Sequence, residues 1–451
     1  MANDRLERLY ARRRCGMRPG LAAMQDLLAR LGHPEEGLAV AHIAGTNGKG
    51  SVAAMVTEVL TAAGCRVGRY TSPHLLRFNE RVFVDGRPTD DAALGAAVDE
   101  VEDAASEAER AGGQPLTFFE CATAVACAVF RRAGIRLAVV ETGLGGRLDA
   151  TNVLTPLVSA ITRIGLDHCE QLGDTIEAIA GEKAGIIKPG RPVVCGAMPE
   201  EARAVIRRTA SERHCPFLDA AEEIGVAIAS TSLEGLTVRV TTPSRELGKV
   251  RVPLAGTFQA ENIATAVATI ETVAQQIGIE IADDALCTGL GRVCWPGRFQ
   301  LAVREPLMVV DGAHNPDAAA ALREALRRLK FKGPVALVAG LCADKDAAAF
   351  VRTLAPAVTR AWAVPVPSAR TLPAADAAGL MRAAGIGTVE VAEVPAALDA
   401  AQAWARGAGG LVLVCGSLFL AGQALALLGA YPWPLDDPGR LADPNETLKP
   451  G

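Results

Sequence analysis

Residues 45–51, Gly-Thr-Asn-Gly-Lys-Gly-Ser, lie between an apolar run at 38–44 and a helical pattern at 52–60. The order of strand, glycine loop and helix is typical of a phosphate-binding loop. Glycines let backbone N–H groups turn toward an anion, and the helix start adds the positive end of its dipole. Lys49 supplies a point charge for terminal phosphates, and the Ser51 hydroxyl can hold Mg²⁺. The segment therefore predicts a phosphate site on an α/β sheet.

The loop departs from the common P-loop pattern at two places. Ile43 stands where a glycine is expected five positions before Gly48, and Gly50 follows Lys49 with the serine one place later. The segment is therefore a variant of the phosphate-binding loop. An ordinary glycine turn before a helix is the alternative, and the combination of lysine, serine, strand and helix argues against it.

Size and charge narrow the class of protein. With 451 residues, half of them apolar, the chain is large enough for two or three domains. The formal charge of −5 argues against a general nucleic-acid or membrane-surface binder. Small anionic substrates remain compatible with this charge.

The N-terminus and the cysteines indicate the compartment. The first eight residues lack an apolar signal core, and no uncharged apolar run approaches the roughly 20 residues that span a bilayer. The eleven cysteines are scattered singly and never form a C-x-x-C pair. This spacing predicts neither a disulfide scaffold nor a zinc site, so most thiols are expected to be small core residues. We expect a cytoplasmic protein.

Alternating strands and helices predict a parallel sheet in the first part of the chain. After the phosphate-binding loop come a helical pattern at 121–131 and apolar strands at 137–140 and 157–161. Such alternation places chemistry at the carboxyl ends of the strands. Between 217 and 252, short alternating segments predict an antiparallel appendage, and a helix at 261–277 returns to the first sheet.

A second α/β domain is predicted after 295–298, where proline and glycine interrupt the pattern. Its expected strands are 307–310, 334–339, 360–364, 388–391 and 411–415. The predicted fold class is α/β: an N-terminal P-loop ATPase domain at 1–296, with a mostly parallel sheet and a small antiparallel appendage, followed by a Rossmann-like C-terminal domain at 297–433. Residues 434–451 are expected to form a loose tail.

Polar residues follow two strands of the first predicted sheet. Glu141, at the end of the strand 137–140, is the first candidate for a Mg²⁺ ligand, because a carboxylate at this edge can bind a metal that bridges nucleotide phosphates. The glycines after it allow close approach to a ligand, although a flexible turn would use them as well. His168 is a candidate for a second metal, and Lys183 stands in a small, apolar stretch. Taken alone, each of these two would more often be structural.

The segment 70–81 mixes a hydroxyl, two arginines and an aromatic ring. It can grip an aromatic, anionic small molecule: Phe78 by stacking, Arg77 or Arg81 by charge, and Ser72 by a hydrogen bond or a metal contact. A plain surface loop is the competing interpretation.

Two strand-to-helix junctions in the second half carry Asp311, His314 and Ser417. Both junctions belong at the crevice of a doubly wound sheet. If the two domains face each other, these junctions close over the phosphate-binding loop, and Arg298 can reach the transferred phosphate.

Together these segments resemble the folylpolyglutamate synthase and dihydrofolate synthase family, within the Mur ligase superfamily of ATP-dependent amide-forming enzymes. The resemblance runs from about residue 38 to residue 428. Its motifs occur in the family's order: Gly-Thr-Asn-Gly-Lys-Gly-Ser, Thr-Ser-Pro-His-Leu, Glu-Thr-Gly-Leu-Gly-Gly-Arg-Leu-Asp-Ala-Thr-Asn, Leu-Asp-His, Glu-Lys-Ala-Gly-Ile, Pro-Gly-Arg-Phe and Asp-Gly-Ala-His-Asn-Pro. The combination is far more specific than the loop alone.

The resemblance implies a ligase of folate biosynthesis and one-carbon metabolism. ATP phosphorylates a substrate carboxylate, and the amine of L-glutamate attacks the acyl phosphate to give an amide, ADP and phosphate. The implied acceptors are dihydropteroate and reduced folates; many bacterial members use both, and we expect the same here. We further expect a monomer without nucleic-acid or membrane partners, two Mg²⁺ sites, and room for a monovalent cation.

The resemblance also implies roles for individual residues. The ATP-binding residues are Gly45, Thr46, Asn47, Gly48, Lys49, Gly50, Ser51, Asn262, Arg298 and Asp311. The Mg²⁺ ligands are Ser51, Ser72, Glu141 and His168. The substrate-binding residues are Ser72, Pro73, His74, Arg77, Phe78, Arg81, His314 and Ser417. The catalytic residues are Lys49, Lys183, His168, Arg298 and His314, and Lys183 matches a lysine that can carry a carbamate, which turns a cation into an oxygen ligand for Mg²⁺.

Two alternatives are kept. Another Mur-type ligase, joining an amino acid to a UDP-linked muramyl acid, shares the nucleotide site but is expected to carry an additional N-terminal domain, and only about 37 residues precede the first strand. A nucleotide-dependent switch explains the phosphate-binding loop but not the two further strand-end clusters. Nucleotide turnover that is equally fast without pterin or glutamate would favour the switch.

Overall fold

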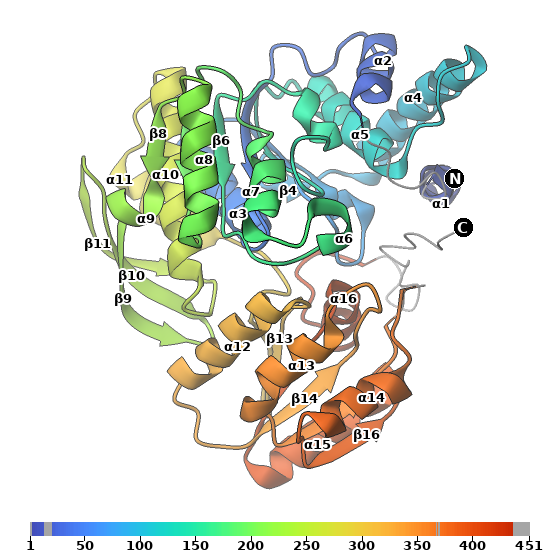
Figure 1. Ribbon diagram of the computed structural model, residues 1–451, viewed down its shortest axis with the longest axis vertical. Helices are drawn as coiled ribbons and strands as arrows, with labels where there is room; N and C mark the ends of the chain where they lie inside the picture. Colours follow the sequence, from blue (N-terminus) through green and yellow to red (C-terminus); the bar gives the residue numbers. More distant parts are fainter. Residues whose placement is uncertain (1, 13–19, 367, 369, 436–451) are drawn as a thin grey trace.

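The computed structural model describes residues 2–12, 20–366, 368 and 370–435, and these form two α/β units (Figure 1). We call them the N-terminal unit, which holds an eight-stranded sheet (strands between Ala39 and Asp219) with a three-stranded appendage, and the C-terminal unit, which holds a six-stranded sheet (strands between Gln300 and Cys415). In Figure 1 the two units lie one above the other. The predicted α/β fold class is confirmed.

Parallel strands make up most of the N-terminal sheet, whose order is β4-β3-β2-β5-β1-β6-β7-β8. At its centre β1 (Ala39–Ala44) pairs in parallel with β5 (Leu137–Glu141) and β6 (Val158–Ile161). The other strands are β2 (Val67–Tyr70), β3 (Val82–Val84), β4 (Arg87–Pro88), β7 (Val193–Cys195) and β8 (Phe217–Asp219). Because the three central strands run in the same direction, the loops that follow them meet at one edge of the sheet.

Helices cover both faces of this sheet (Figure 1). Alternate residues of β1 point to opposite faces, so Ile43 joins the core beneath α3 (Lys49–Ala62) and Val40 joins the core beneath α5 (Phe118–Arg132). The remaining helices of the unit are α1 (Ala2–Ala11), α2 (Ala22–Arg30), α4 (Asp91–Arg110), α6 (Cys169–Leu172), α7 (Ile176–Ala184), α8 (Glu200–Glu212), α9 (Ala220–Glu223), α10 (Gln259–Ile277) and α11 (Asp283–Arg292).

Helix α5 begins at Phe118, before the predicted start at 121. The reason is a capping box. The Thr117 hydroxyl accepts the amide N–H of Glu120, and the Glu120 carboxylate accepts the amide N–H of Thr117. This reciprocal pair satisfies two backbone donors of the first turn and thereby sets where the helix starts.

Arginines of the N-terminal helix anchor it on α4. Arg12, just after α1, donates Nε to the two carboxylate oxygens of Glu102 at 2.8 and 3.0 Å, and Nη1 to Glu109 at 2.6 Å. Only 11% of the Arg12 side chain and 8% of the Glu102 side chain are exposed. An ion pair shielded from water in this way leaves a buried charge when one partner is removed.

Replacing Arg12 with alanine is expected to lower the free energy of unfolding by about 3 kcal/mol, because the Glu102 carboxylate stays buried without its cation. Arg8→Ala is the matched control on the same helix. The Arg8 side chain is 51% exposed in its pair with Asp99, and a pair of this kind contributes less than about 1 kcal/mol. Urea denaturation of both variants and the parent measures the two losses, and equal losses would contradict this account.

The predicted antiparallel appendage is present as a sheet in the order β11-β10-β9. Its strands are β9 (Gly225–Ser232), β10 (Gly235–Thr241) and β11 (Glu246–Val252). The predicted range of 217–252 is wrong at its start, because β8 pairs in parallel with β7 and belongs to the large sheet. Local alternation of side chains does not tell which sheet a short strand joins.

The C-terminal sheet has the order β12-β13-β17-β14-β15-β16, and only β12 with β13 is an antiparallel pair. The strands are β12 (Gln300–Arg304), β13 (Leu307–Val310), β14 (Val335–Ala339), β15 (Arg360–Ala363), β16 (Thr388–Val391) and β17 (Leu411–Cys415). The helices are α12 (Pro316–Arg328), α13 (Ala347–Leu354), α14 (Ala374–Ala383), α15 (Val394–Ala408) and α16 (Leu418–Leu427). The five predicted strands are confirmed, whereas the half-buried edge strand β12 was missed.

The last described residues return to the N-terminal unit. The Trp433 ring packs against the Phe83 ring with 5.4 Å between centroids, and the Pro434 carbonyl accepts a hydrogen bond from Arg77 Nη1. A loose tail starting at 434 is therefore wrong for Pro434, which this contact holds. Residues 436–451 of that predicted tail lie outside the described residues.

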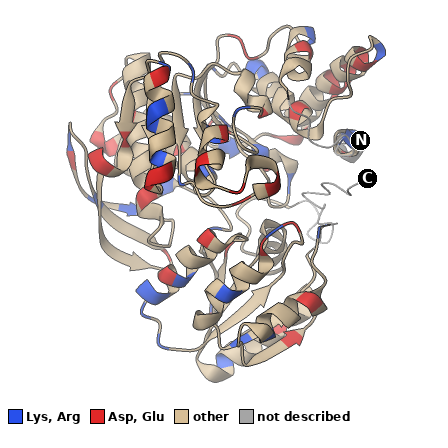
Figure 2. Cartoon of the chain, in the orientation of Figure 1, with Lys and Arg blue, Asp and Glu red and all other residues tan. Residues whose placement is uncertain are grey.

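Helix hydrophobicity, surface charge and cysteine burial can be followed in the described part of the chain. Within it, every helix is too short or too polar to cross a membrane. Figure 2 shows acidic and basic residues interspersed along outer helices such as α8. The described cysteines are free thiols, and half of them are buried, fewer than the majority expected to be small core residues.

Candidate active site

The loop after β1 is shaped by close contacts of its glycines. A Cβ on Gly45 would lie 1.9 Å from Thr162 Oγ1, and a Cβ on Gly48, whose φ is +91°, would lie 2.2 Å from Asn262 Oδ1. Only glycine allows the backbone to approach β6 and α10 this closely. The loop amides are thereby left at the N-terminus of α3, where an anion is favoured.

The Lys49 ammonium lies inside this loop. Its Nζ donates to the carbonyls of Gly45 and Thr46 at 3.1 and 3.3 Å and lies 3.9 Å from Glu141 Oε1. With 17% of its side chain exposed, Lys49 is held within the site rather than extended into solvent. A phosphate entering the loop would replace the weak contacts to carbonyls with a charge-assisted pair.

The Glu141 carboxylate ends β5 in a buried position beside the phosphate-binding loop. The backbone N–H of Ser72 donates to Glu141 Oε2 at 3.3 Å. Burial raises the pKa of Glu141, and the Lys49 ammonium opposes this shift. A carboxylate in this position is available to a cation bound with a phosphate.

Lys183 is buried on α7, and its ammonium contacts the phosphate-binding loop. Its Nζ donates to the Gly45 carbonyl at 2.9 Å. Burial, and then the Lys49 charge, lower the pKa of Lys183 to about 7. A substantial fraction of this amine is therefore neutral, and hence nucleophilic, near neutral pH.

Asp167, which sequence reasoning did not select, joins the two units. Its Oδ1 accepts Lys345 Nζ at 2.6 Å, and its Oδ2 accepts Asn315 Nδ2 at 3.1 Å and lies 3.7 Å from His314 Nε2. Although burial raises it, the contact with His314 and the Lys345 charge hold the pKa of Asp167 below its usual range. Asp167 thus connects the segment after β6 to the loops that follow β13 and β14.

His168 lies next to this carboxylate in a left-handed conformation, with φ +53°. Its Nε2 is 3.0 Å from Lys345 Nζ. Burial, and then the Lys345 charge, lower the pKa of His168 to about 3, so the imidazole is neutral at physiological pH. A neutral imidazole is the form that ligates metal ions.

A second polar link across the units involves Asp317 in the first turn of α12. Its Oδ2 accepts Asn47 Nδ2 at 3.0 Å and Arg163 Nε at 3.0 Å. The phosphate-binding loop therefore contacts the C-terminal unit directly. Arg163 and Asp317 were not selected from the sequence, although Asp317 follows the predicted strand-end cluster at Asp311.

Arg298 and Asp311 lie at the start of the C-terminal unit, where its first two strands meet. Asp311 accepts the amide N–H of Phe299 and that of Ala313, each at 2.6 Å. Arg298 Nη1 donates to the Gly297 carbonyl at 2.9 Å. Asp311 thus fixes the loop that presents Arg298 to the cavity.

One cavity of about 450 Å³ joins these groups between the two units. Its walls include most of the predicted site residues, namely Gly45, Thr46, Asn47, Gly48, Lys49, Gly50, Ser51, Ser72, Pro73, Glu141, His168, Lys183, Asn262, Arg298, Asp311 and His314. Asp167, Arg163 and Asp317 line it as well. A volume of this size suits a nucleotide or a substrate of similar dimensions.

Five predicted substrate residues do not line this cavity. His74, Phe78 and Arg81 are buried in a cluster of rings, where Arg81 Nε donates to His74 Nδ1 at 2.8 Å. Arg77 pairs with Asp91, and Ser417 is buried as the cap of α16. Their contacts with a substrate stay predictions.

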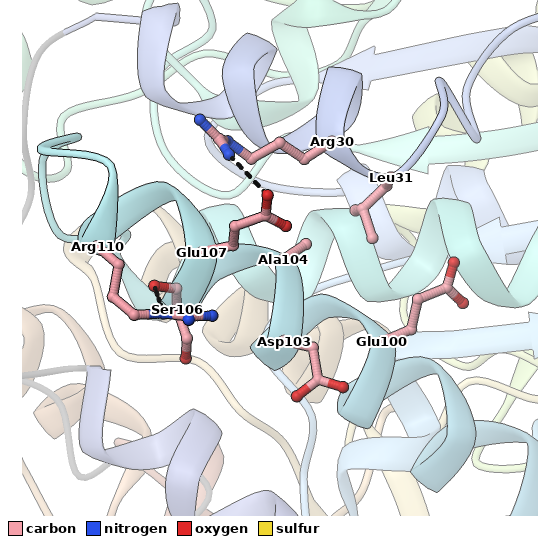
Figure 3. A pocket seen from close by; sticks show the side chains of 8 residues that line it. All are labelled: Arg30, Leu31, Glu100, Asp103, Ala104, Ser106, Glu107 and Arg110. Atoms are coloured by element: carbon pink, nitrogen blue, oxygen red, sulfur yellow. Dashed lines mark hydrogen bonds and ion pairs between the residues drawn. The ribbon is translucent and has the colours of Figure 1, made fainter.

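A separate cavity of about 380 Å³ lies between α2 and α4, away from the phosphate-binding loop (Figure 3). Arg30 pairs across it with Glu107, with 3.5 Å between Nη1 and Oε1, and Arg110 donates to the Ser106 carbonyl.

Both units match known families. Residues 43–270 match the Mur ligase middle domain, and residues 297–418 match the Mur ligase glutamate ligase domain. The folylpolyglutamate synthase of Lacticaseibacillus casei is 40% identical over 77% of this chain and 82% of that protein. The dihydrofolate synthase/folylpolyglutamate synthase of Escherichia coli K12 is 34% identical over 91% of this chain and 92% of that protein.

The fold has the same counterparts among solved structures. A Mycobacterium tuberculosis folylpolyglutamate synthase complexed with ADP superposes with a TM-score of 0.89 at 31% identity. The match covers 96% of this chain and the whole of the other. Sequence and structure therefore point to one group of relatives.

Proposed function

This chain belongs to the folylpolyglutamate synthase/dihydrofolate synthase family of Mur ligases, and we propose that it joins L-glutamate both to dihydropteroate and to the γ-carboxylate of reduced folates. It is an ATP-dependent, amide-forming ligase, since its relatives along most of its length are such ligases. The alternatives of a UDP-muramyl ligase and of a switch are set aside by the same relatives. The monomeric state and the cytoplasmic location stay predictions.

The residue assignments are supported by a cavity that residues of both units line. Lys49 of the phosphate-binding loop and Arg298 of the C-terminal unit both line this one cavity. ATP phosphates held by the loop would have Lys49 at one end and Arg298 at the transferred group. Asn262 and Asp311, which line the same space, are assigned to the nucleotide on the family resemblance.

The chemistry has two steps. An oxygen of the acceptor carboxylate attacks the γ-phosphorus of ATP, the bond to the β-phosphate oxygen breaks, and ADP leaves. The nitrogen of glutamate then attacks the carbonyl carbon of the acyl phosphate, phosphate leaves, and the nitrogen loses a proton. Both steps are accelerated mainly by holding the reactants in line and by neutralising charge.

His314 and Ser417 are assigned to the incoming glutamate by the resemblance. His314 Nδ1 lies 2.8 Å from the Gly312 carbonyl, which fixes the ring and directs Nε2 toward Asp167. A ring held in this way can orient an amine at the rim of the cavity. The loop 72–81 is assigned to the acceptor, with Ser72 and Pro73 at the cavity wall.

The oxygen donors beside the loop fit Mg²⁺. The buried carboxylate of Glu141 and the hydroxyl-bearing Ser51 and Ser72 line one cavity, and Mg²⁺ is held in such sites by one or two carboxylates together with phosphate oxygens and water. When bound, Mg²⁺ neutralises charge on the phosphates. Within the described residues, no three His, Cys, Asp or Glu side chains form a group that could hold a metal ion. A second Mg²⁺ at His168 and a monovalent cation stay predictions.

Phosphate release by the purified protein with MgATP and L-glutamate tests the function. We expect release with dihydropteroate and with tetrahydrofolate, and little without a pterin. Release with one acceptor only would assign a single-activity enzyme. Release with neither would point to another ligase substrate, and release that is equally fast without pterin or glutamate would restore the switch.

A further inference from the structure

We propose that Tyr431 is a positioning residue for the ligation reaction: from the segment after the last helix of the C-terminal unit, its hydroxyl holds Glu80 and thereby sets the loop that presents Ser72 and Pro73 to the nucleotide cavity. The proposal rests on the proposed function, because it assigns a task to a residue that touches neither ATP nor the acceptor. In this role, a residue of the C-terminal unit controls the shape of a loop in the N-terminal unit.

Glu80 is the hub of this loop. Its carboxylate is buried and accepts the backbone N–H groups of Leu75, Leu76 and Arg77 at 2.8, 2.7 and 2.7 Å. The Tyr431 hydroxyl donates to the same carboxylate, to Oε1, at 2.6 Å. Three backbone amides of the loop and one side chain of the other unit therefore donate to a single carboxylate. Charge-assisted hydrogen bonds of this kind are about twice as strong as neutral ones.

The loop is also inserted into the C-terminal unit. Leu75 and Leu76 are each 6% exposed and belong to the core that includes Met308 of β13 and Leu420 of α16. A Cβ on Gly422 would lie 2.7 Å from the Leu75 carbonyl oxygen, so α16 and the loop backbone are in direct contact. A shift of the C-terminal unit must therefore move this loop.

The other end of the loop reaches the reaction site. Ser72 and Pro73 line the nucleotide cavity, and the Ser72 amide donates to Glu141. Only one residue, His74, separates Pro73 from the first of the amides that Glu80 holds. The bond from Tyr431 to Glu80 is thus a few residues away from the cavity wall along one continuous piece of backbone.

The segment that carries Tyr431 is itself held in place. The Tyr431 ring packs edge-on against the Trp433 ring with 5.4 Å between centroids, and Trp433 packs against Phe83 of β3. The Ala430 carbonyl accepts Gln300 Nε2 at 2.9 Å. The Tyr431 hydroxyl is therefore held in a fixed position, which a residue needs if it is to orient another.

Tyr431→Phe tests the proposal because it keeps the ring and removes only the hydroxyl. We expect kcat for ligation to fall about tenfold through misplacement of Ser72 and Pro73, with the Kd for an ATP analogue changed less than about twofold. Hydrogen–deuterium exchange of residues 72–81 should rise, because one of the four bonds to Glu80 is lost. The melting temperature reports whether the variant remains folded.

Tyr70→Phe is the matched control. Its buried hydroxyl accepts Thr123 Oγ1 at 3.3 Å within the N-terminal unit, so the same chemical change is made without touching the link between units. Normal kcat in Tyr431→Phe, or exchange in 72–81 that rises no more than in Tyr70→Phe, would overturn the proposal. If the parent protein itself fails to ligate glutamate, the proposed function fails, and the exchange measurement still decides whether Tyr431 controls the loop.

Discussion

Lys49→Ala is expected to abolish ligation, lowering kcat/KM by at least about a thousandfold while the protein stays folded. Among the described residues, the Lys49 ammonium contacts the carbonyls of Gly45 and Thr46 and lies 3.9 Å from Glu141 Oε1. Its loss removes one cation from a site that must accept the phosphates of ATP. Those phosphates would then face the buried Glu141 carboxylate with one positive charge fewer to offset the repulsion.

Phosphate release with saturating L-glutamate and dihydropteroate measures the effect, and circular dichroism checks the fold. Lys249→Ala is the matched control, because Lys249 is exposed on β11 of the appendage and should leave kcat/KM unchanged. Turnover in Lys49→Ala close to that of the parent would show that the loop does not bind the reacting phosphates.

Lys183→Ala is expected to lower activity by at least about a hundredfold, and formate or acetate should restore part of it. The amine, whose pKa burial and then Lys49 lower to about 7, can attack CO₂ in its neutral form. In the proposed modification, a nitrogen–carbon bond would form and a proton would be released, so the product would be a carbamate with a negative charge. A small carboxylate occupying the space left by alanine would supply the same oxygens.

The pH dependence follows from the same pKa. The neutral amine fraction rises as pH increases through about 7, so activation by added bicarbonate should be greater at pH 8 than at pH 6. Without a carbamate, the folded chain binds this proton less tightly than the unfolded chain. The Lys183 contribution to the unfolding free energy should therefore increase with pH between about 7 and 10.5.

Lys188→Ala is the control for this position. Lys188 follows α7 and donates to the Asn152 carbonyl at 2.9 Å, outside the cavity. It should retain activity within about threefold of the parent and show no response to formate. A fully active Lys183→Ala variant would show that the buried lysine is peripheral to the reaction.

Much of the candidate site could be predicted from strand ends. Glu141 and Asp311 each follow an apolar run, and the carboxyl ends of parallel strands meet at one edge, so local sequence was enough to select both. Lys345 lies six residues beyond Ala339, the last residue of β14, so the same rule does not select it directly. It was missed because the loop there carries no motif that marks it.

Among the other missed features, the capping box had a local signal and the rest did not. Thr117 and Glu120 form a capping box that a closer inspection of the sequence would have found, but the pairing of β8 with β7 depends on a partner strand. The insertion of Leu75 and Leu76 into the core of the other unit gives no sign in a loop that looks polar and aromatic. Burial of these residues is set by what packs against them.

Short-range patterns were enough to predict the phosphate-binding loop, the α/β class and the order of the motifs, because glycine positions, hydrophobic periodicity and residues after strands act over a few neighbouring residues. Which of those residues meet depends on how the whole chain packs. Asp167 contacts Lys345, and Glu80 contacts Tyr431, across hundreds of intervening residues. Such contacts arise from the packing of whole units against each other, which local patterns of side chains do not encode.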